Sequence, residues 1–450
     1  MSFDHLNSIY RNYDIRGKYP DKITEDEVRG IGRAVVDLYD AESVVIGFDH
    51  RPSTSSLTEA LIEGITMQGA HVINLGLVTT PMLYLGSGST DAKVAIMITA
   101  SHMPSEFNGL KICIEDSVPL GLDSGLSEIR DYVKKGTFQS TNNKGNVTKM
   151  DIKPMWRAKI TEFVTLSPEK TTKVVIDPAN TVGILEIDTL KQYNDALYVT
   201  SIFDVLDYTC PNHEANPMKL ETLKDLSEEV VKTESAIGIA LDGDADRIGI
   251  VDEAGTPVPQ DMIGVLVAEE LLRRHGENVI MHDVRSSKRV NEVVKKAGGK
   301  AIPVQIGHTY IRRRMREHNA LFALELSGHH FFRDMHFSEG GILPALLIIE
   351  MMRKDNKKLS ELVAEHKIYE HSGEINSEVT KTAEEIYTHL KEAFPNAEVE
   401  TIDGLTLTYD DWWCNVRPSA NDPVMRLNLE ADTKDLMESK IKKVLKIIRG

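Results

Sequence analysis

Apolar runs recur along the chain, and helical patterns or polar loops separate them. The run at 94–98 is apolar at every position, which is typical of a buried strand. A loop that carries Pro104, Asn108 and Gly109 follows this run directly. Because loops at strand ends carry much of the chemistry of α/β proteins, the polar residues after each apolar run are candidates for a site.

A strand–helix–strand pattern is present three times. The expected strands lie at 44–48, 72–75 and 94–98, then at 173–176, 197–199 and 237–241, and then at 278–281, 301–304 and 321–324. Helical patterns follow the first strand of each copy, for example at 56–68 and 289–297. This alternation predicts mixed, largely parallel sheets with helices on their faces. The loops that follow the last strand of each copy are then expected to line a common cleft.

The pattern changes after residue 367. The expected elements there are a strand at 377–379, a helix at 383–394, strands between 398 and 409, and a terminal helix from Asp432. We therefore expect an α/β protein with three similar mixed-sheet domains and a smaller C-terminal α+β domain. The expected domains span 1–146, 147–253, 254–366 and 367–450, and the polar stretch 135–146 is the first linker.

Composition narrows the class of protein. The 450 residues carry a net charge of −17, and no long basic run with interleaved aromatic residues is present, so we expect no nucleic-acid partner. Cys113, Cys210 and Cys414 lack the spacing of a zinc site or a disulfide framework. No secretory signal and no apolar segment of the roughly 20 residues that span a bilayer is visible. We expect a cytoplasmic protein without membrane contact.

The loop after the run at 94–98 contains a candidate nucleophile. Ser101 stands at the end of the expected strand, His102 lies beside it, and Lys111 follows ten residues later. A serine held at a strand end with a neighbouring imidazole and an amine suits covalent catalysis or phosphate binding. A simple Ser-His turn between two strands is the alternative interpretation.

A second loop joins the expected strand at 237–241 to the next apolar run. Asp242, Asp244 and Asp246 alternate along it. Like charges so close together repel, and a bound cation removes the repulsion; carboxylate oxygens suit magnesium. A calcium EF-hand loop is excluded because Arg247 stands where that loop needs glycine. A cluster of solvated aspartates is the alternative without a metal.

Two further polar loops suit a sugar phosphate. Glu325, Ser327 and His329 follow the expected strand at 321–324, and they offer donors and acceptors for hydroxyl groups and a proton-transfer group. The segment 417–426 combines two arginines with a small polar loop, which suits a phosphate group. A structural histidine pair and a surface turn are the respective alternatives.

Taken together, these loops resemble those of the α-D-phosphohexomutase family, in particular its phosphomannomutase/phosphoglucomutase branch. The resemblance covers nearly the whole chain, and its motifs are Tyr13-Asp14-Ile15-Arg16-Gly17, Thr99-Ala100-Ser101-His102, Asn108-Gly109-Leu110-Lys111, Asp242-Gly243-Asp244-Ala245-Asp246-Arg247, Glu325-Leu326-Ser327-Gly328-His329 and Arg417-Pro418-Ser419. It implies a heart-shaped enzyme of four domains around a central cleft. It also implies a phosphoserine at Ser101 and a reaction through a hexose 1,6-bisphosphate.

The resemblance implies a role for each matching residue. The expected metal ligands are Asp242, Asp244, Asp246 and the phosphate of Ser101, and the expected ion is Mg²⁺. The expected catalytic residues are Ser101, Arg16, Lys111, Arg247 and His329. The expected substrate-binding residues are Tyr13, Arg285, His308, Glu325, Ser327, Arg417, Ser419, Asn421 and Arg426. The expected partners are small sugar phosphates, and the expected state is a monomer or a weak homo-oligomer.

Three departures from the family pattern affect the binding loops rather than the nucleophile. Ala420-Asn421-Asp422 replaces a segment that usually carries a second hydroxyl, Arg285 stands where lysine is common, and Met103 precedes Pro104 in place of asparagine. Four functions remain open at this point. The first is a hexose phosphomutase for mannose and glucose phosphates. The others are a phosphoglucosamine mutase, a magnesium phosphatase with an aspartate nucleophile, and a sugar-phosphate-binding protein without activity.

Overall fold

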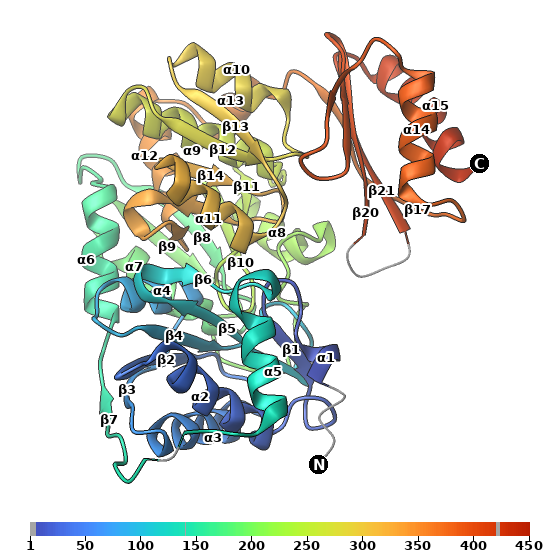
Figure 1. Cartoon of the computed structure of the whole chain (residues 1–450). Helices are drawn as coiled ribbons and strands as arrows, with labels where there is room; N and C mark the ends of the chain where they lie inside the picture. Colours follow the sequence, from blue (N-terminus) through green and yellow to red (C-terminus); the bar gives the residue numbers. More distant parts are fainter. Residues whose placement is uncertain (1–5, 140, 420–423) are drawn as a thin grey trace.

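The structure is a computed structural model that describes residues 6–139, 141–419 and 424–450. Over these residues the strands form four sheets, which follow one another along the chain (Figure 1). The first three are mixed or largely parallel and carry helices, and the fourth is antiparallel. The expected class, three α/β domains and a smaller C-terminal α+β domain, is confirmed.

The first sheet runs β1-β5-β4-β2-β3-β7, with β6 paired to β5. Its strands are β1 (Ile15–Lys18), β2 (Ser43–Phe48), β3 (His71–Leu77), β4 (Val94–Ile98), β5 (Phe107–Ile114), β6 (Val118–Pro119) and β7 (Val147–Lys149). Its helices are α2 (Glu25–Tyr39), α3 (Thr54–Met67), α4 (Thr80–Gly88) and α5 (Ser127–Lys135). The expected domain boundary between residues 146 and 147 lies directly before β7, which pairs with β3.

Strand β4 shows why strands of this sheet are apolar at consecutive positions of the sequence. Its residues are all buried, and they alternate between two cores. Ile96 and Ile98 pack with the core of the first domain, whereas Ala95 and Met97 belong to a core that continues into the second and third domains. A strand with both faces covered needs no polar positions, so it carries its polar chemistry only at its end.

The second sheet runs β11-β10-β8-β9, with β10 and β11 antiparallel and the other pairs parallel. Its elements are β8 (Thr172–Asp177), β9 (Leu197–Ser201), β10 (Ile237–Leu241), β11 (Ile248–Asp252), α6 (Lys153–Phe163), α7 (Leu185–Lys191) and α8 (Lys224–Thr233). Residues 242–247 form the tight connection between β10 and β11, so the acidic loop is held at both ends by buried strands.

The third sheet runs β13-β12-β14-β15-β16. Its strands are β12 (Val279–Asp283), β13 (Lys300–Val304), β14 (Phe322–Leu324), β15 (His330–Phe332) and β16 (Ser338–Glu339). Its helices are α9 (Gln260–His275), α10 (Lys288–Lys296), α11 (His308–His318), α12 (Leu343–Asp355) and α13 (Leu359–Ala364). The expected sugar loop, 325–329, connects β14 to β15.

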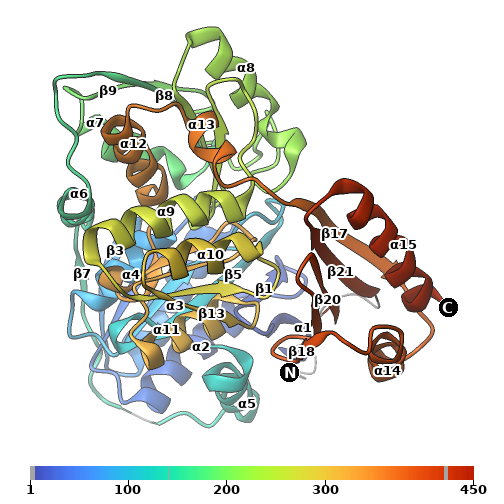
Figure 2. The ribbon, with the colours of Figure 1, turned by 90° about the horizontal axis from the view of Figure 1, so that it is seen from above.

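The fourth sheet runs β17-β21-β20-β19-β18 and is antiparallel. Its elements are β17 (Glu370–Glu378), β18 (Glu398–Glu400), β19 (Leu405–Thr408), β20 (Trp412–Pro418), β21 (Val424–Ala431), α14 (Ala383–Ala393) and α15 (Lys434–Arg449). Helices α14 and α15 cover the face turned away from the other domains, and the opposite face is turned toward them (Figures 1 and 2). This domain has a core of its own.

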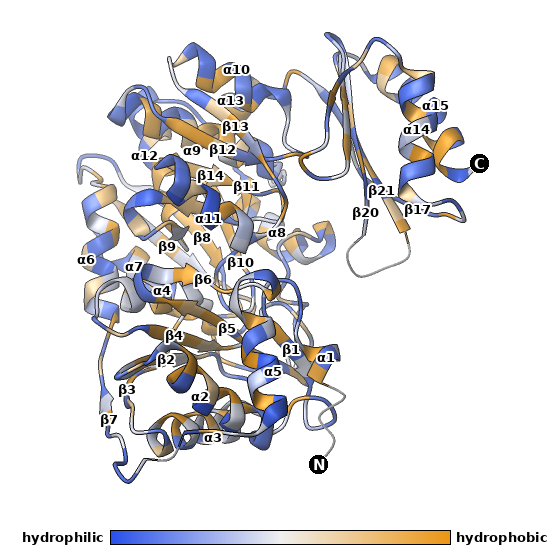
Figure 3. Ribbon diagram, viewed as in Figure 1, coloured by the Kyte–Doolittle hydropathy of each residue, from blue (hydrophilic) through white to orange (hydrophobic). Residues whose placement is uncertain are grey.

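Short helical turns complete the chain, at α1 (Leu6–Ile9), η1 (Glu115–Ser117), η2 (Leu122–Leu126), η3 (Val182–Ile184), η4 (Leu220–Leu223) and η5 (Arg333–Met335). The hydropathy colouring shows hydrophobic strands inside and hydrophilic outer faces on the helices (Figure 3). Among the described residues, no helix combines the length and apolar character that crossing a membrane requires.

Candidate active site

Ser101 follows β4 and lies almost completely buried, with 1% of its surface exposed. Its Oγ donates a hydrogen bond to Asp242 Oδ2 over 2.9 Å and lies 3.2 Å from His102 Nδ1. Burial, with the nearby charges of Arg247 and Arg16, lowers the pKa of His102 to about 2, so this imidazole is neutral at neutral pH. The hydroxyl is therefore held between a carboxylate and an uncharged ring.

The backbone of Ser101 is in the left-handed region, with φ of 52°. This conformation is strained for a residue other than glycine, and it persists only where the surrounding structure holds it. The acidic loop lies close to this backbone: a Cβ on Gly243 would lie 2.1 Å from the carbonyl oxygen of Ser101. Glycine at position 243 thus allows the acidic loop to lie directly against the serine loop.

The three aspartates of the acidic loop converge as the sequence predicted. Asp242, Asp244 and Asp246 are buried, and one carboxylate oxygen of each lies within 4.8 Å of the others. Burial raises the pKa of Asp242, and the negative charges of Asp246 and Asp244 add to this rise. Within the described chain, Asp244 Oδ1 and Asp246 Oδ1 have no hydrogen-bond partner. Unpartnered buried carboxylate oxygens of this kind fit a hard divalent cation.

Lys111, on β5, balances part of this negative charge. Its ammonium lies 2.6 Å from Asp244 Oδ2 and also pairs with Asp246 Oδ2. Burial opposes the charged form of Lys111, but the two carboxylates outweigh it and raise the pKa of the amine well above its usual value. Thr80 also donates to Asp244 Oδ2, over 2.6 Å.

Arg247, at the end of the acidic loop, reaches the sugar loop. Its backbone forms an isolated β-bridge with His329, and its Nε donates to His329 Nε2 over 3.1 Å. Because a guanidinium can only donate, Nε2 accepts, and the ring proton belongs on Nδ1. Burial, followed by the charges of Arg247 and Lys111, lowers the pKa of His329 well below its usual value.

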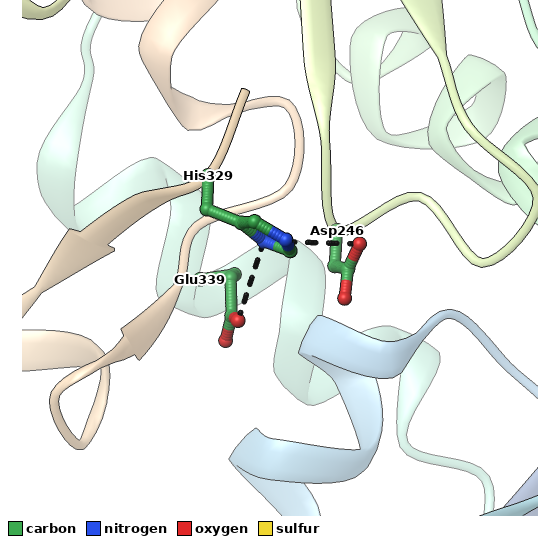
Figure 4. Close-up of side chains that lie close together, drawn as sticks. All are labelled: Asp246, His329 and Glu339. Carbon is green, nitrogen blue, oxygen red and sulfur yellow. Dashed lines mark ion pairs between the residues drawn. The ribbon is translucent and has the colours of Figure 1, made fainter. Parts of the chain in front are cut away.

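The Nδ1 atom of His329 faces two carboxylates (Figure 4). It lies 3.5 Å from Glu339 Oε1 and 3.9 Å from Asp246 Oδ1. Glu339 is 1% exposed, and burial raises the pKa of its carboxyl group to about 7. Glu339 thus faces the proton of His329 and leaves Nε2 as the accepting nitrogen. The sequence offered no signal for this residue.

Arg16 lies on β1, which pairs with β5 so that Arg16 is opposite Gly109. Its guanidinium forms an ion pair with Asp14 at 2.5 Å. Burial would lower the pKa of Arg16, but Asp14, with smaller contributions from Asp244 and Asp246, raises it overall. Arg16 therefore brings a permanent positive charge to the edge of the acidic cluster.

A second group of expected residues surrounds the start of α11. Glu325 Oε1 accepts the backbone N–H of Gly307 over 3.1 Å, and burial raises the pKa of Glu325. The ring of Tyr13 packs edge-on against His308, and His308 stacks on His329 with ring centres 6.1 Å apart. These contacts connect the sugar loop to the start of α11 and to Tyr13.

Arg285 and Ser327 face the fourth domain. Arg285 forms an ion pair with Asp283 at 2.6 Å and lies 3.9 Å from both Glu325 and Glu374. Arg285 and Ser327 line a cavity of about 730 Å³ between the third domain and β17. This volume is in the range of pockets that hold small molecules.

The expected phosphate-binding residues gather around Glu374 on β17. Arg417 donates to Glu374 Oε2 over 2.5 Å, and Arg426 Nη1 lies 3.3 Å from Glu374 Oε1. Arg426 Nη2 also donates to the hydroxyl of Ser419 over 2.9 Å. Asn421, which the sequence placed in the same group, lies outside the described residues. Glu374 was not predicted, because it lies on a different strand and some 40 positions from the arginine motif.

Comparison with known proteins agrees with this arrangement. Models described as phosphoglucomutase/phosphomannomutase, alpha/beta/alpha domains I, II and III match residues 7–140, 155–255 and 259–369. The chain is 33% identical over 448 residues to a protein named phosphomannomutase from Methanocaldococcus jannaschii, with 98% of this chain and 97% of that protein covered. It is 32% identical over 457 residues to a protein of the same name from Vibrio cholerae, with 98% of each covered.

Solved structures give the same result. The crystal structure of a phosphoglucomutase/phosphomannomutase family protein from Burkholderia thailandensis matches with a TM-score of 0.88 at 27% identity, covering 98% of this chain and 97% of that one. Similarity therefore extends over the serine loop, the acidic loop, the sugar loop and the fourth domain together. The chain belongs to the α-D-phosphohexomutase family, as its phosphoglucomutase/phosphomannomutase domains show.

Proposed function

We propose that this phosphohexomutase interconverts the 1-phosphates and 6-phosphates of mannose and glucose through a phosphoserine at Ser101 and a hexose 1,6-bisphosphate. The observation that carries the proposal is the position of the Ser101 hydroxyl, 2.9 Å from Asp242 in the acidic loop that Lys111 and Arg247 also contact. A nucleophile, an acidic cluster and two cations at one point suit phosphoryl transfer.

We propose Mg²⁺ as the cation of this site, held by Asp242, Asp244, Asp246 and the phosphate on Ser101. The unpartnered buried oxygens of Asp244 and Asp246 support this assignment. When bound, magnesium would neutralise negative charge on the phosphoryl group and raise its electrophilicity. Oxygen-only ligands favour magnesium over softer metals.

In the first half of the reaction, the phosphoryl group on Ser101 moves to the free hydroxyl of a hexose 1-phosphate or 6-phosphate. The bond from Ser101 Oγ to phosphorus breaks and the bond from the sugar oxygen to phosphorus forms, while the sugar hydroxyl loses its proton and Ser101 Oγ gains one. We propose His329 as the group that takes the hydroxyl proton, which requires Arg247 to release Nε2 first. Arg16, Lys111 and Arg247 stabilise the charge on the phosphoryl oxygens. The bisphosphate then turns, and its other phosphoryl group returns to Ser101.

The remaining residues hold the sugar and the phosphate that does not react. We propose that Glu325 and Ser327 bind sugar hydroxyls, with Tyr13 and His308 beside them. Arg285, Arg417, Ser419, Asn421 and Arg426 would bind the second phosphate. Glu374, which now pairs with the arginines around it, would have to give way to the incoming anion. We propose that these roles are distributed over four domains, with boundaries near residues 146, 253 and 366.

The test measures kcat/KM for mannose 1-phosphate, glucose 1-phosphate and glucosamine 1-phosphate, with Mg²⁺ and a trace of hexose 1,6-bisphosphate. We expect turnover of the first two and a much slower reaction of the third. Ser101→Ala should abolish turnover and incorporation of phosphate from the bisphosphate. Ser105→Ala removes a hydroxyl from the same loop and should leave turnover unchanged.

Other outcomes separate the alternatives. A preference for glucosamine 1-phosphate would keep the mechanism and change the substrate to that of a phosphoglucosamine mutase. Release of free phosphate through an intermediate that hydroxylamine cleaves would favour the aspartate phosphatase, although the relatives reported above are named mutases. Full turnover by Ser101→Ala would refute the phosphoserine mechanism.

A further inference from the structure

We propose that Arg51 is a positioning residue that holds the Ser101 loop in its reactive conformation. Arg51 lies just after β2, far along the chain from Ser101, and its side chain is 8% exposed. The inference rests on the proposed phosphoserine mechanism, to which it adds a residue that acts through Ser101 without touching the substrate.

The guanidinium of Arg51 donates to carbonyl oxygens along the whole serine loop. Nη2 donates to Ser101 over 2.5 Å and to Met103 over 2.8 Å. Nη1 donates to Pro104 over 2.7 Å and to Phe107 over 3.0 Å. Only a planar group with several fixed donors can satisfy this many carbonyls at once.

The third nitrogen of Arg51 fixes the side chain itself. Nε donates to Asp49 Oδ2 over 2.9 Å, and Asp49 is 2% exposed. Asp49 Oδ1 accepts the hydroxyl of Thr54 over 3.0 Å at the start of α3, and the Asp49 N–H donates to the carbonyl of Ile98 at the end of β4. Through Asp49, the side chain of Arg51 is therefore anchored to β4 and to the start of α3.

An open space borders the serine loop beside Arg51. A cavity of about 320 Å³ lies against it, lined by residues 101–105 of the loop and by Asp49, His50 and Arg51. The Ser101 carbonyl also lies against Gly243, which lines the same cavity. The carbonyl thus contacts both Gly243 and Arg51, and Ser101 has a left-handed φ of 52°. Without Arg51 the loop has space to relax away from Asp242.

Such relaxation should affect the chemical step and spare substrate binding. The sugar and the distal phosphate are bound by the third and fourth domains, whereas Arg51 controls where Ser101 Oγ lies. A displacement of about 1 Å can lower a rate about 10²-fold. We therefore expect Arg51→Gln to lower kcat about 10²-fold per phosphorylated chain, with KM changed less than about twofold. Arg51→Lys should recover part of the loss, and guanidinium ion should partly rescue Arg51→Ala.

The experiment compares wild type, Arg51→Gln, Arg51→Lys and Arg51→Ala, with phosphate on Ser101 counted after reaction with hexose 1,6-bisphosphate. Arg29→Gln is the matched control, because it removes an arginine of the same domain that pairs with Asp26 and Glu63 far from the loop. Its kcat should equal that of wild type. Hydrogen exchange of residues 101–107 gives a second readout that needs no turnover, and it should accelerate in Arg51→Gln but not in Arg29→Gln.

The outcomes are distinct. Wild-type kcat together with wild-type exchange of the loop in Arg51→Gln overturns the inference. If Arg51→Gln and Arg51→Ala do not fold, Arg51→Lys tests the inference, because an ammonium cannot donate to all four carbonyls. Wild-type kcat and wild-type exchange of the loop in Arg51→Lys would also overturn the inference. Failure of wild type to turn over hexose phosphates would refute the proposed function, while loop exchange would still report on Arg51.

Discussion

Replacing Lys111 with methionine tests the electrostatics of the site most directly. The side chain of Lys111 is 7% exposed, and those of its partners Asp244 and Asp246 are 0% and 2% exposed. Methionine keeps much of the volume and removes the charge. The carboxylates of Asp244 and Asp246 then remain buried, beside Asp242, without their main cation. We expect Lys111→Met to destabilise the protein as well as to abolish turnover.

The size of the effect follows from the burial. Removing one partner of a buried ion pair costs about 3–5 kcal/mol, because the remaining charge stays desolvated. For domains of 150–250 residues, 1 kcal/mol shifts Tm by about 2–4 °C, so a loss of roughly 6–20 °C is expected. Mg²⁺ should restore more stability to the variant than to wild type, because the freed carboxylates gain a cation.

The assay is calorimetric unfolding in EDTA and in Mg²⁺. Lys93→Met is the matched control, because Lys93 is an exposed lysine whose ammonium donates to the Asp40 carbonyl next to the same sheet. Its free energy of unfolding should change by no more than about 0.5 kcal/mol, as is usual for a surface substitution. If Lys111→Met in EDTA loses less than about 1 kcal/mol, or if Mg²⁺ stabilises it no more than wild type, the electrostatic reasoning is wrong.

Three further predictions follow from single contacts. Gly243→Ala places a Cβ 2.1 Å from the Ser101 carbonyl, so kcat should fall about 10²-fold; an unchanged kcat would contradict the close approach of the two loops. Glu339→Gln should lower kcat about 10-fold or more with little change in KM, because Glu339 orients His329. An unchanged kcat of Glu339→Gln, measured beside that of His329→Gln, would refute this role. Burial raises the pKa of Glu186 to about 7, so its contribution to stability is complete below the unfolded pKa near 4.5 and is lost as the pH rises through 7. Wild type should therefore lose about 3 kcal/mol of stability between pH 4.5 and 7.5 relative to Glu186→Gln. Plots of Tm against pH that run parallel for the two proteins would refute this.

Much of the fold could be predicted because the strands near the site are buried on both faces. The expected strand at 94–98 is β4 (Val94–Ile98), and the expected strand at 237–241 is β10 (Ile237–Leu241). Their apolar runs end where the chain leaves the sheet, so the polar residues that follow marked the serine and acidic loops. The structure brings these loops into contact through Ser101 and Asp242.

Strands β20 and β21 were missed because buried polar residues interrupt their pattern. Arg417 on β20 donates to Asn428 on β21, and the indole N–H of Trp413 donates to Glu430 over 2.8 Å. These side chains satisfy one another across the sheet, so the strands tolerate them in buried positions. Hydropathy along the sequence cannot show that such partners exist, since each lies on another strand.

The same limit explains why Glu339 and Arg51 were not assigned roles. Arg51 follows the expected strand at 44–48, whereas Glu339 lies beside no expected strand, and the sequence around each gives no indication of its partner. Glu339 acquires a role only when β16 brings it to His329, and Arg51 only when the serine loop folds over it. Sequence motifs revealed residues that would act on a ligand, whereas residues that orient other side chains became visible only as contacts.

The hydrogen bond between Ser101 and Asp242 links phosphorylation to cation binding. The free hydroxyl donates a hydrogen bond to Asp242, but a phosphorylated Ser101 has no hydroxyl hydrogen to donate and brings negative charge to the same carboxylate. Two like charges about 4 Å apart repel by about 4 kcal/mol at the effective dielectric of a protein surface, and Asp244 and Asp246 add to this. Lys111 is already shared between those two carboxylates. The phosphorylated protein should therefore bind divalent cations more tightly than the unphosphorylated protein, and the phosphoserine should in turn depend on the cation for its stability.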